Sequence, residues 1–168
     1  MKKEIYNNNN IRRQDRLLDE SAAMELLRSG EYGILSMVEP FGVNVGGYGI
    51  PISYVWDGEI SIYFHCALEG HKLKCLKTNP STSFCIVGHT KIIPYQFATA
   101  YESVIIRGVV YLELSPEERM KALMLILDKY SPAHKEAGVK YTENSFHRTN
   151  VIRFDIKEIS GKTRLSKP

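Results

Sequence analysis

The stretch EISIYFHCALEGHKLKCLK, residues 59–77, decides the expected fold. Apolar and polar side chains alternate from Ile60 to His65, which predicts a β-strand with one apolar face. Gly70 permits a sharp turn after this strand, and three lysines that follow it before residue 78 indicate a basic helix. The stretch therefore predicts a strand, a tight turn and a helix in direct succession.

The start of this helix is a candidate phosphate site. A helix that begins just after a strand presents free backbone N–H groups and the positive end of its dipole. Lys72 adds a full positive charge in the first turn. A phosphate bound at residues 70–72 would place His65 and Cys66 beside the rest of the ligand.

The sequence around this stretch predicts further strands in antiparallel pairs. Ile50–Trp56 has the pattern of a strand, and Asp57-Gly58 is a strong signal for a hairpin turn into the strand that follows. Gly108 lies inside the longest predicted strand, where it is a candidate for a β-bulge. The other predicted strands cover residues 31–38, 81–87, 101–112 and 151–159.

Three helices accompany these strands. A short helix is expected at Asp19–Arg28, and a capping box at residues 115–118, with proline at the first helical position, predicts a longer one. Residues 90–100 are expected to form a loop or an extended crossing, and residues 133–150 are polar with little pattern. Six or seven strands joined mostly by short turns favour a closed or partly closed antiparallel barrel with helices packed at its ends.

Length and composition limit the class of protein. The chain has 168 residues, which fits one domain, expected at 11–168, behind a disordered tail at 1–10 that contains four consecutive asparagines. A net charge of +3, from 22 basic and 19 acidic residues, is too balanced to predict nucleic-acid binding. No apolar run reaches the roughly 20 residues of a membrane span, and no secretory signal is evident, so a cytoplasmic protein is expected.

The three cysteines do not predict a disulfide framework. Cys66, Cys75 and Cys85 are odd in number and contain no C-x-x-C pair, which is typical of a reducing compartment. Cys66, His71 and Cys75 are close enough in sequence to be considered as zinc ligands. They lack the paired second half that a zinc knuckle needs, so buried free thiols are the preferred interpretation and no metal is expected.

Several short segments occur along the chain in the same order as in a known protein family. They are Arg12-Arg13-x-Asp15-Arg16, Gly49-Ile50-Pro51, Phe64-His65-Cys66-Ala67-x-Glu69-Gly70-x-Lys72-Leu73, Tyr101-Glu102-Ser103-Val104 running to Gly108, and, more weakly, Ile159-Ser160-Gly161-Lys162. In this order the chain resembles the pyridoxamine-phosphate-oxidase-like split-barrel superfamily, and within it the nitroimidazole-resistance (Nim) branch of flavin-binding proteins. The resemblance implies a mainly β fold, an antiparallel Greek-key split barrel with flanking helices.

The resemblance also implies a cofactor and an assembly. Members of this family are homodimers that bind two FMN molecules in clefts between the subunits. By this likeness Pro51, Ile52, Ser53 and Tyr54 would pass under the flavin ring, and His65 and Cys66 would border the cofactor. His71 and Lys72 would hold the phosphate. Ser103 would reach the ring from the long strand.

The implied activity is that of an FMN-dependent oxidoreductase that reduces small nitroaromatic compounds such as 5-nitroimidazoles, with NAD(P)H as a possible donor. His65 is the candidate catalytic residue, where it could donate a proton or hold an anionic group of the substrate. True pyridoxamine phosphate oxidases carry a C-terminal motif rich in tryptophan and arginine. The single tryptophan here is Trp56, so pyridoxamine phosphate is not the expected substrate.

A second hypothesis is a non-catalytic binding protein with the same fold. The same barrel could store or sense a flavin or a tetrapyrrole without turning over a substrate. His65 and His71 would then face a haem rather than a flavin. The absorbance spectrum of the purified protein separates these two hypotheses.

Overall fold

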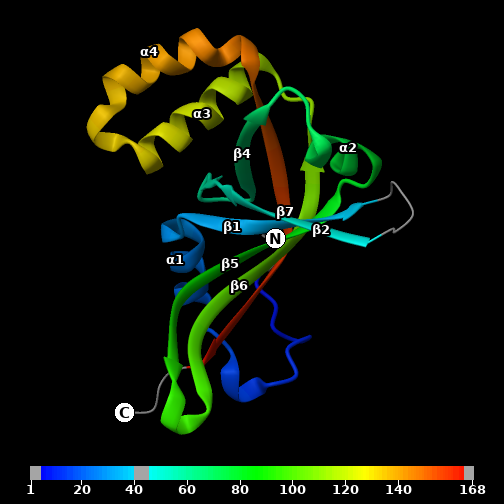
Figure 1. The fold of residues 1–168 in the computed structure, drawn as a ribbon, viewed down its shortest axis with the longest axis vertical. Coiled ribbons are helices and arrows are strands. Elements are labelled where there is room, and N and C mark those ends of the chain that lie inside the picture. The colour runs from blue at the N-terminus through cyan, green and yellow to red at the C-terminus, as the bar shows by residue number, and fades with distance from the viewer. Residues whose placement is uncertain (1–4, 40–45, 165–168) are drawn as a thin grey trace.

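The computed structural model describes residues 5–39 and 46–164. One antiparallel sheet runs the length of the molecule, and an α-helical hairpin covers one end of it (Figure 1). The strands are β1 Tyr32–Glu39, β2 Gly46–Ser53, β3 Val55–Trp56, β4 Ser61–Ala67, β5 Ser81–Ile93, β6 Ala98–Tyr111 and β7 Thr149–Arg164. The helices are α1 Glu20–Ser29, α2 His71–Thr78, α3 Pro116–Tyr130 and α4 Lys135–Ser145, with short 3-10 turns at Gln14–Arg16, Pro94–Gln96, Pro132–His134 and Phe146–Arg148.

The seven strands pair in the order β2-β1-β5-β6-β7-β4-β3, and every neighbouring pair is antiparallel. β2 also approaches β4, so the sheet curves around its core. The described strands do not close into a continuous ring, because β2 and β3 remain its two edges. This arrangement confirms the mainly β split barrel with flanking helices that the family resemblance implied.

The inner face of the curved sheet forms the main core. Phe64 and Phe84 are fully buried, with ring centroids 5.1 Å apart and an edge-to-face geometry that aromatic pairs prefer. α1 closes one side of this core with Ala23 and Leu27, both fully buried. Because full burial of a side chain of the size of Leu or Phe stabilises a fold by about 1.5–3 kcal/mol, this face holds the strands together.

Gly108 confirms the predicted bulge. The register between β6 and β7 shifts between Arg107 and Gly108. A Cβ atom at residue 108 would lie 2.1 Å from the carbonyl oxygen of Asp155, so no larger residue fits without moving the β7 backbone. The glycine therefore allows β6 and β7 to stay paired through the bend.

α3 covers the outer face of the sheet at one end and forms a second, smaller core. Its N-terminus is capped by Ser115, whose Oγ accepts a hydrogen bond from the Glu118 N–H at 3.2 Å, as the capping box predicted. Ala122 and Leu123 pack against Tyr63 and Val151. Tyr63 was expected on the polar face of its strand, but it is only 6% exposed because α3 lies over it.

Two segments differ from the expectation. α4 occupies part of the region for which no pattern was expected, and it returns along α3 to complete the hairpin seen in Figure 1. β5 and β6 extend through much of the predicted loop at 90–100 and form a long two-stranded arm, with pairing from Thr90 and Tyr101 outward to Ile93 and Ala98. No helix within the described ranges combines the length and apolarity that a membrane span requires.

The tail expected at residues 1–10 is described from residue 5 onward, and residues 1–4 lie outside the described ranges. Tyr6 forms a parallel bridge with Ile159 on β7, and the Asn7 N–H donates to the Ile159 carbonyl at 2.8 Å. Asn8 Oδ1 accepts a hydrogen bond from the Gly161 N–H at 2.9 Å. These contacts place residues 5–8 against the last strand, in contrast to the expected disorder.

Candidate functional site

The first turn of α2 leaves backbone donors without helical partners. Gly70 precedes the helix with φ of +149°, a conformation that favours glycine, and among the described residues no side chain caps the helix. The Leu73 N–H donates to the Gly70 carbonyl at 3.2 Å, so helical pairing begins only there. The N–H groups of His71 and Lys72 precede that point and are available to an anion.

β4 delivers His65 and Cys66 to the vicinity of Lys72. His65 pairs in register with Val151 on β7, and its side chain is exposed. Partial burial lowers the pKa of His65 below its ordinary value, and the charge of Lys72 lowers it further. The pKa of Cys66 is raised by burial, with Lys72 acting in the opposite direction. At neutral pH the site therefore holds one ammonium group beside an uncharged imidazole and an uncharged thiol.

His71 is turned toward β1 and β2 by a different set of contacts. Its Nε2 atom lies 2.8 Å from Glu39 Oε1 and 3.7 Å from Cys75 Sγ, and its ring meets the edge of Tyr48 with centroids 4.8 Å apart. His71 and Cys75 share a helix face, as their spacing predicted. Because a carboxylate already faces His71, Lys72 is the cation of this helix start that is better placed for an anion.

The predicted run Pro51–Tyr54 divides between the two faces of the sheet. Pro51 is exposed and Ser53 is partly exposed, whereas Ile52 packs against the main core. Tyr54 is fully buried, and its hydroxyl donates to the Leu27 carbonyl at 2.6 Å. The Tyr54 side chain is therefore part of the core, and only the alternate residues 51 and 53 present side chains on the open face.

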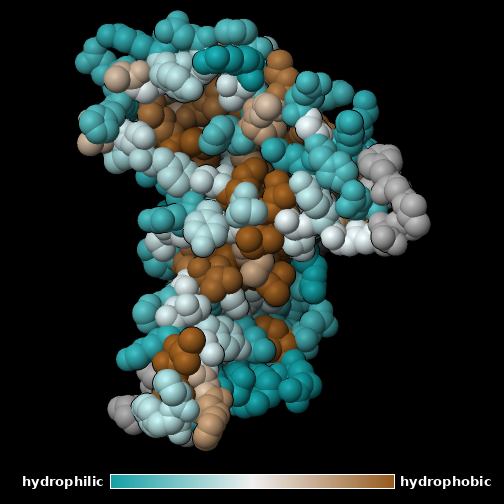
Figure 2. All heavy atoms as spheres, in the orientation of Figure 1, coloured by the Kyte–Doolittle hydropathy of each residue, from teal (hydrophilic) through white to brown (hydrophobic). Residues whose placement is uncertain are grey.

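That open face is apolar across several strands. Pro51 pairs with Ile34, Ile34 with Cys85, and Cys85 with Ile105, so these four side chains form one row. Ile34 and Ile105 are 36% and 42% exposed. Ser103 lies two residues from Ile105 and shares this face. Figure 2 shows apolar side chains reaching the surface across the middle of the molecule.

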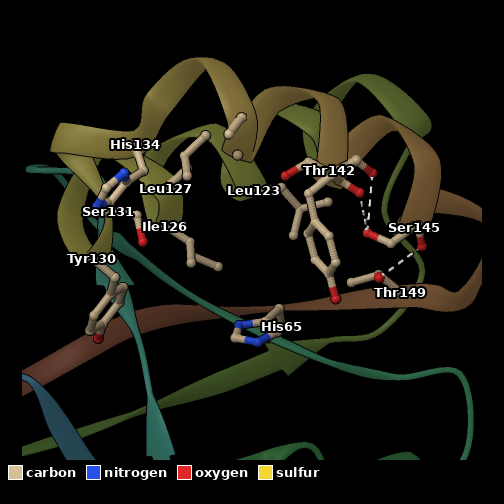
Figure 3. A pocket seen from close by; sticks show the side chains of 13 residues that line it. His65, Leu123, Ile126, Leu127, Tyr130, Ser131, His134, Thr142, Ser145 and Thr149 are labelled. Carbon is tan, nitrogen blue, oxygen red and sulfur yellow. Dashed lines mark hydrogen bonds between the residues drawn. The ribbon is translucent and has the colours of Figure 1, made fainter.

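A pocket of about 460 Å³ lies between β4 and the hairpin of α3 and α4. His65 lies below the two helices, with Leu123, Leu127 and Thr142 above it (Figure 3). Thr149, at the start of β7, borders the same space. The sequence did not predict this pocket, because α4 and its residues Thr142 and Ser145 fell in the segment without a recognisable pattern.

A second hollow, beside the C-terminal end of α3, contains a half-buried lysine. Lys129 Nζ donates to the Gly30 carbonyl at 2.7 Å and lies 3.8 Å from the centroid of the Tyr54 ring. Burial lowers the pKa of Lys129 to about 8. The Tyr130 hydroxyl accepts a hydrogen bond from the Tyr54 N–H at 2.9 Å, so the end of α3 is tied to the residue between β2 and β3. No group of three or more metal-ligating side chains occurs within the described ranges.

Comparisons with known proteins agree with the split-barrel fold described above. A family model described as pyridoxamine 5'-phosphate oxidase matches residues 19–163. A crystal structure of a candidate 5-nitroimidazole antibiotic resistance protein from Bacteroides thetaiotaomicron is similar with a TM-score of 0.68 and 17% identity, over 88% of this chain and 86% of that one. No curated protein sequence matches the chain.

Two further solved structures share the architecture. A FAD-binding protein from Mesorhizobium loti has a TM-score of 0.59 and 18% identity, over 90% of this chain and 97% of that one. A FAD and haem binding protein from Mycobacterium smegmatis has a TM-score of 0.76 and 13% identity, over 91% of this chain and 75% of that one. At these identities the likeness establishes the fold.

Proposed function

Because the chain belongs to the pyridoxamine 5'-phosphate oxidase family, we propose that it is a flavoprotein oxidoreductase that binds FMN between two copies of itself and reduces small nitroaromatic compounds. The observation that carries the proposal is the position of Lys72 at the uncapped start of α2, the helix that follows β4 with its residues His65 and Cys66. Two backbone N–H groups, a helix dipole and one ammonium suit a phosphate monoester. A Cβ atom at Gly70 would meet no described atom within 4 Å, so there is room for a ligand in front of this turn.

The apolar open face supports the second copy of the chain. Ile34, Ile105 and Val87 expose 36%, 42% and 56% of their surface on neighbouring strands. A contiguous apolar patch of this kind is typical of an interaction surface, and two-fold symmetry is the commonest solution among homo-oligomers. Pro51, Ser53 and Ser103 lie on the same face, so a partner laid over it would help to enclose a flavin next to them.

When bound, the flavin would supply the electron transfer, and the residues of this chain would bind, orient and shield the reactants. His65 is kept neutral by its environment, so one ring nitrogen can donate a hydrogen bond while the other accepts one. Such a donor suits a nitro oxygen of a substrate. The similar fold of the candidate 5-nitroimidazole resistance protein supports this substrate class, with the electron donor proposed to be NADH or NADPH.

A second candidate is a binder of flavin or haem that has no turnover. The observation in its favour is that, in the described part of the chain, the imidazole of His65 makes no hydrogen bond or ion pair and could serve as an axial ligand. The similar fold of a protein that binds both FAD and haem agrees with this alternative.

Anaerobic reduction of the purified, flavin-loaded protein tests the proposed function. Addition of NADPH or NADH is expected to bleach the flavin absorbance, and a 5-nitroimidazole is expected to restore it with formation of a reduced product. A Soret band in the isolated protein would overturn the proposed function. So would a bound flavin that neither NAD(P)H nor dithionite reduces, or a reduced flavin that the nitro compound does not reoxidise.

A further inference from the structure

The pocket beneath the α3–α4 hairpin combines an apolar wall from the helices with hydroxyl and imidazole groups around it. Leu123, Ile126 and Leu127 project into it from α3, and Ala137 and Tyr141 line it from α4. Its volume of about 460 Å³ falls within the range of roughly 300–1,000 Å³ that is typical of small-molecule sites. The space is therefore large enough for one or two aromatic rings and is built mainly from apolar surface.

Charge is absent from the lining of this pocket. None of the thirteen described residues that border it is Asp, Glu, Lys or Arg. A carboxylate or phosphate placed there would lose part of its hydration without gaining a full opposite charge, which disfavours its binding. The pocket therefore selects against charged ligands, in contrast to the α2 start with its lysine.

Three of the six hydroxyl groups that line the pocket already make hydrogen bonds to the protein, those of Tyr130, Ser145 and Thr149. Ser145 Oγ donates to the Tyr141 carbonyl at 2.8 Å, and Thr149 Oγ1 donates to the Ser145 carbonyl at 2.9 Å (Figure 3). His65 makes no comparable bond within the described ranges, and it lies at the bottom of the space. Its imidazole is therefore a polar group that a ligand at the bottom of the pocket can use.

We propose that this pocket is the substrate compartment, and that it takes a small uncharged aromatic or heteroaromatic molecule whose acceptor atom receives a hydrogen bond from His65. The inference rests on the proposed function, since His65 lies on β4, the strand that leads to the candidate cofactor site at the start of α2. The hairpin of α3 and α4 is then the roof that determines substrate size, and the uncharged lining excludes phosphorylated substrates such as pyridoxamine phosphate.

Binding measurements on matched ligands and matched variants test this inference. Nitrobenzene and 4-nitrobenzoate share a ring and a nitro group and differ by one carboxylate, and their dissociation constants can be measured by calorimetry or ligand-observed NMR. Ala137→Phe narrows the pocket, and Thr142→Phe narrows it from another position in case the first variant folds poorly. Ala133→Phe is the control, because Ala133 is exposed and does not border the pocket.

The expected result is that nitrobenzene binds at least tenfold more tightly than 4-nitrobenzoate, and that either narrowing variant weakens nitrobenzene binding at least tenfold. FMN content should stay unchanged in all three variants. Equal binding of the two ligands, or unchanged binding in both narrowing variants, would overturn the inference. Loss of FMN from the narrowing variants alone would also overturn it, because the cofactor itself would then occupy the pocket.

The same measurements separate this inference from the proposed function. If the protein takes up no flavin and still binds nitrobenzene with the stated preferences, the proposed oxidoreductase function is wrong. The assignment of the pocket as a site for uncharged aromatic ligands is then retained. If the protein binds FMN and the bound FMN is reduced and reoxidised, but the narrowing variants leave the dissociation constant of nitrobenzene unchanged, the inference about the pocket is wrong. The proposed oxidoreductase function is then retained.

Discussion

The Nε2 atom of His71 lies 2.8 Å from Glu39 Oε1, which joins the first turn of α2 to the end of β1. The two residues that the family resemblance assigned together to a phosphate therefore have different surroundings. His71 faces a carboxylate, whereas Lys72 lies toward His65 and Cys66. The contribution of each to cofactor binding can be measured separately.

Lys72→Ala is expected to weaken FMN binding by about 1–3 kcal/mol, the range for a charge-assisted hydrogen bond. This corresponds to roughly a fivefold to 150-fold rise in the dissociation constant, which quenching of flavin fluorescence can measure. Lys77→Ala is the control, since Lys77 is exposed on the last turn of the same helix. Equal losses in the two variants would show that Lys72 acts only through the net charge of the helix.

His71→Ala is expected to weaken FMN binding less than Lys72→Ala, because the imidazole is already engaged with Glu39. The same fluorescence titration gives the comparison. If His71→Ala has the larger effect, the phosphate lies on the Glu39 side of the helix start, and the assignment of Lys72 as the main cation is wrong.

The His65 imidazole is expected to titrate below its ordinary pKa of 6.5, because partial burial and then the charge of Lys72 disfavour protonation. Between that lowered pKa and 6.5 the unfolded chain binds more protons than the folded one. The free energy of unfolding should therefore fall as pH falls through this window. NMR titration measures the midpoint, and Lys72→Gln should raise it. A midpoint above 6.5, or one that Lys72→Gln does not move upward, contradicts this account.

Burial lowers the pKa of Lys129 from its usual 10.5 to about 8. Between these values the unfolded chain binds the proton that the folded chain releases, so the wild-type protein should gain stability as pH rises through this window. Lys129→Met removes the titrating group and is expected to lack that gain. Urea unfolding of both proteins near both ends of the window gives the difference. A wild-type protein that loses stability relative to the variant across the window would contradict the burial of Lys129 beside Tyr54.

Ile105→Asp is expected to separate the proposed dimer, because it places a charge at the centre of the apolar open face. Light scattering should then report the mass of one chain, with loss of bound FMN. The control is Ile60→Asp, which introduces the same change at a side chain that is 54% exposed and lies before β4. A dimer that persists in Ile105→Asp, or one that both variants disrupt equally, would place the interface elsewhere.

Local patterns predicted the strands and capped helices well. The alternation before His65, the Asp57-Gly58 turn and the capping box at Ser115 act through neighbours in sequence, so they can be recognised without a structure. Gly108 is a similar case, since a glycine inside a long β pattern indicates a bulge. These features were sufficient to predict an antiparallel barrel with helices at its ends, whereas the split barrel was implied by the family resemblance.

Long-range packing determined what the sequence left open. Tyr63 was expected on the polar face of its strand, but α3 covers it. Tyr54 was implied as a flavin contact, but its hydroxyl has a buried carbonyl partner in Leu27. α4 has only a weak apolar stripe, and its Gly138 lies against Leu127 of α3, so its helical state depends on a partner far along the chain. The pocket above His65 was hidden for the same reason.

The cofactor content of the purified protein tests the central claim most directly. After incubation with excess FMN and removal of free ligand, the protein is expected to show the visible absorbance of an oxidised flavin. Denaturation should then release about one FMN per chain, and the Lys72→Ala variant should retain less. A protein that retains no flavin under these conditions, or one whose spectrum is that of a haem, would contradict the account.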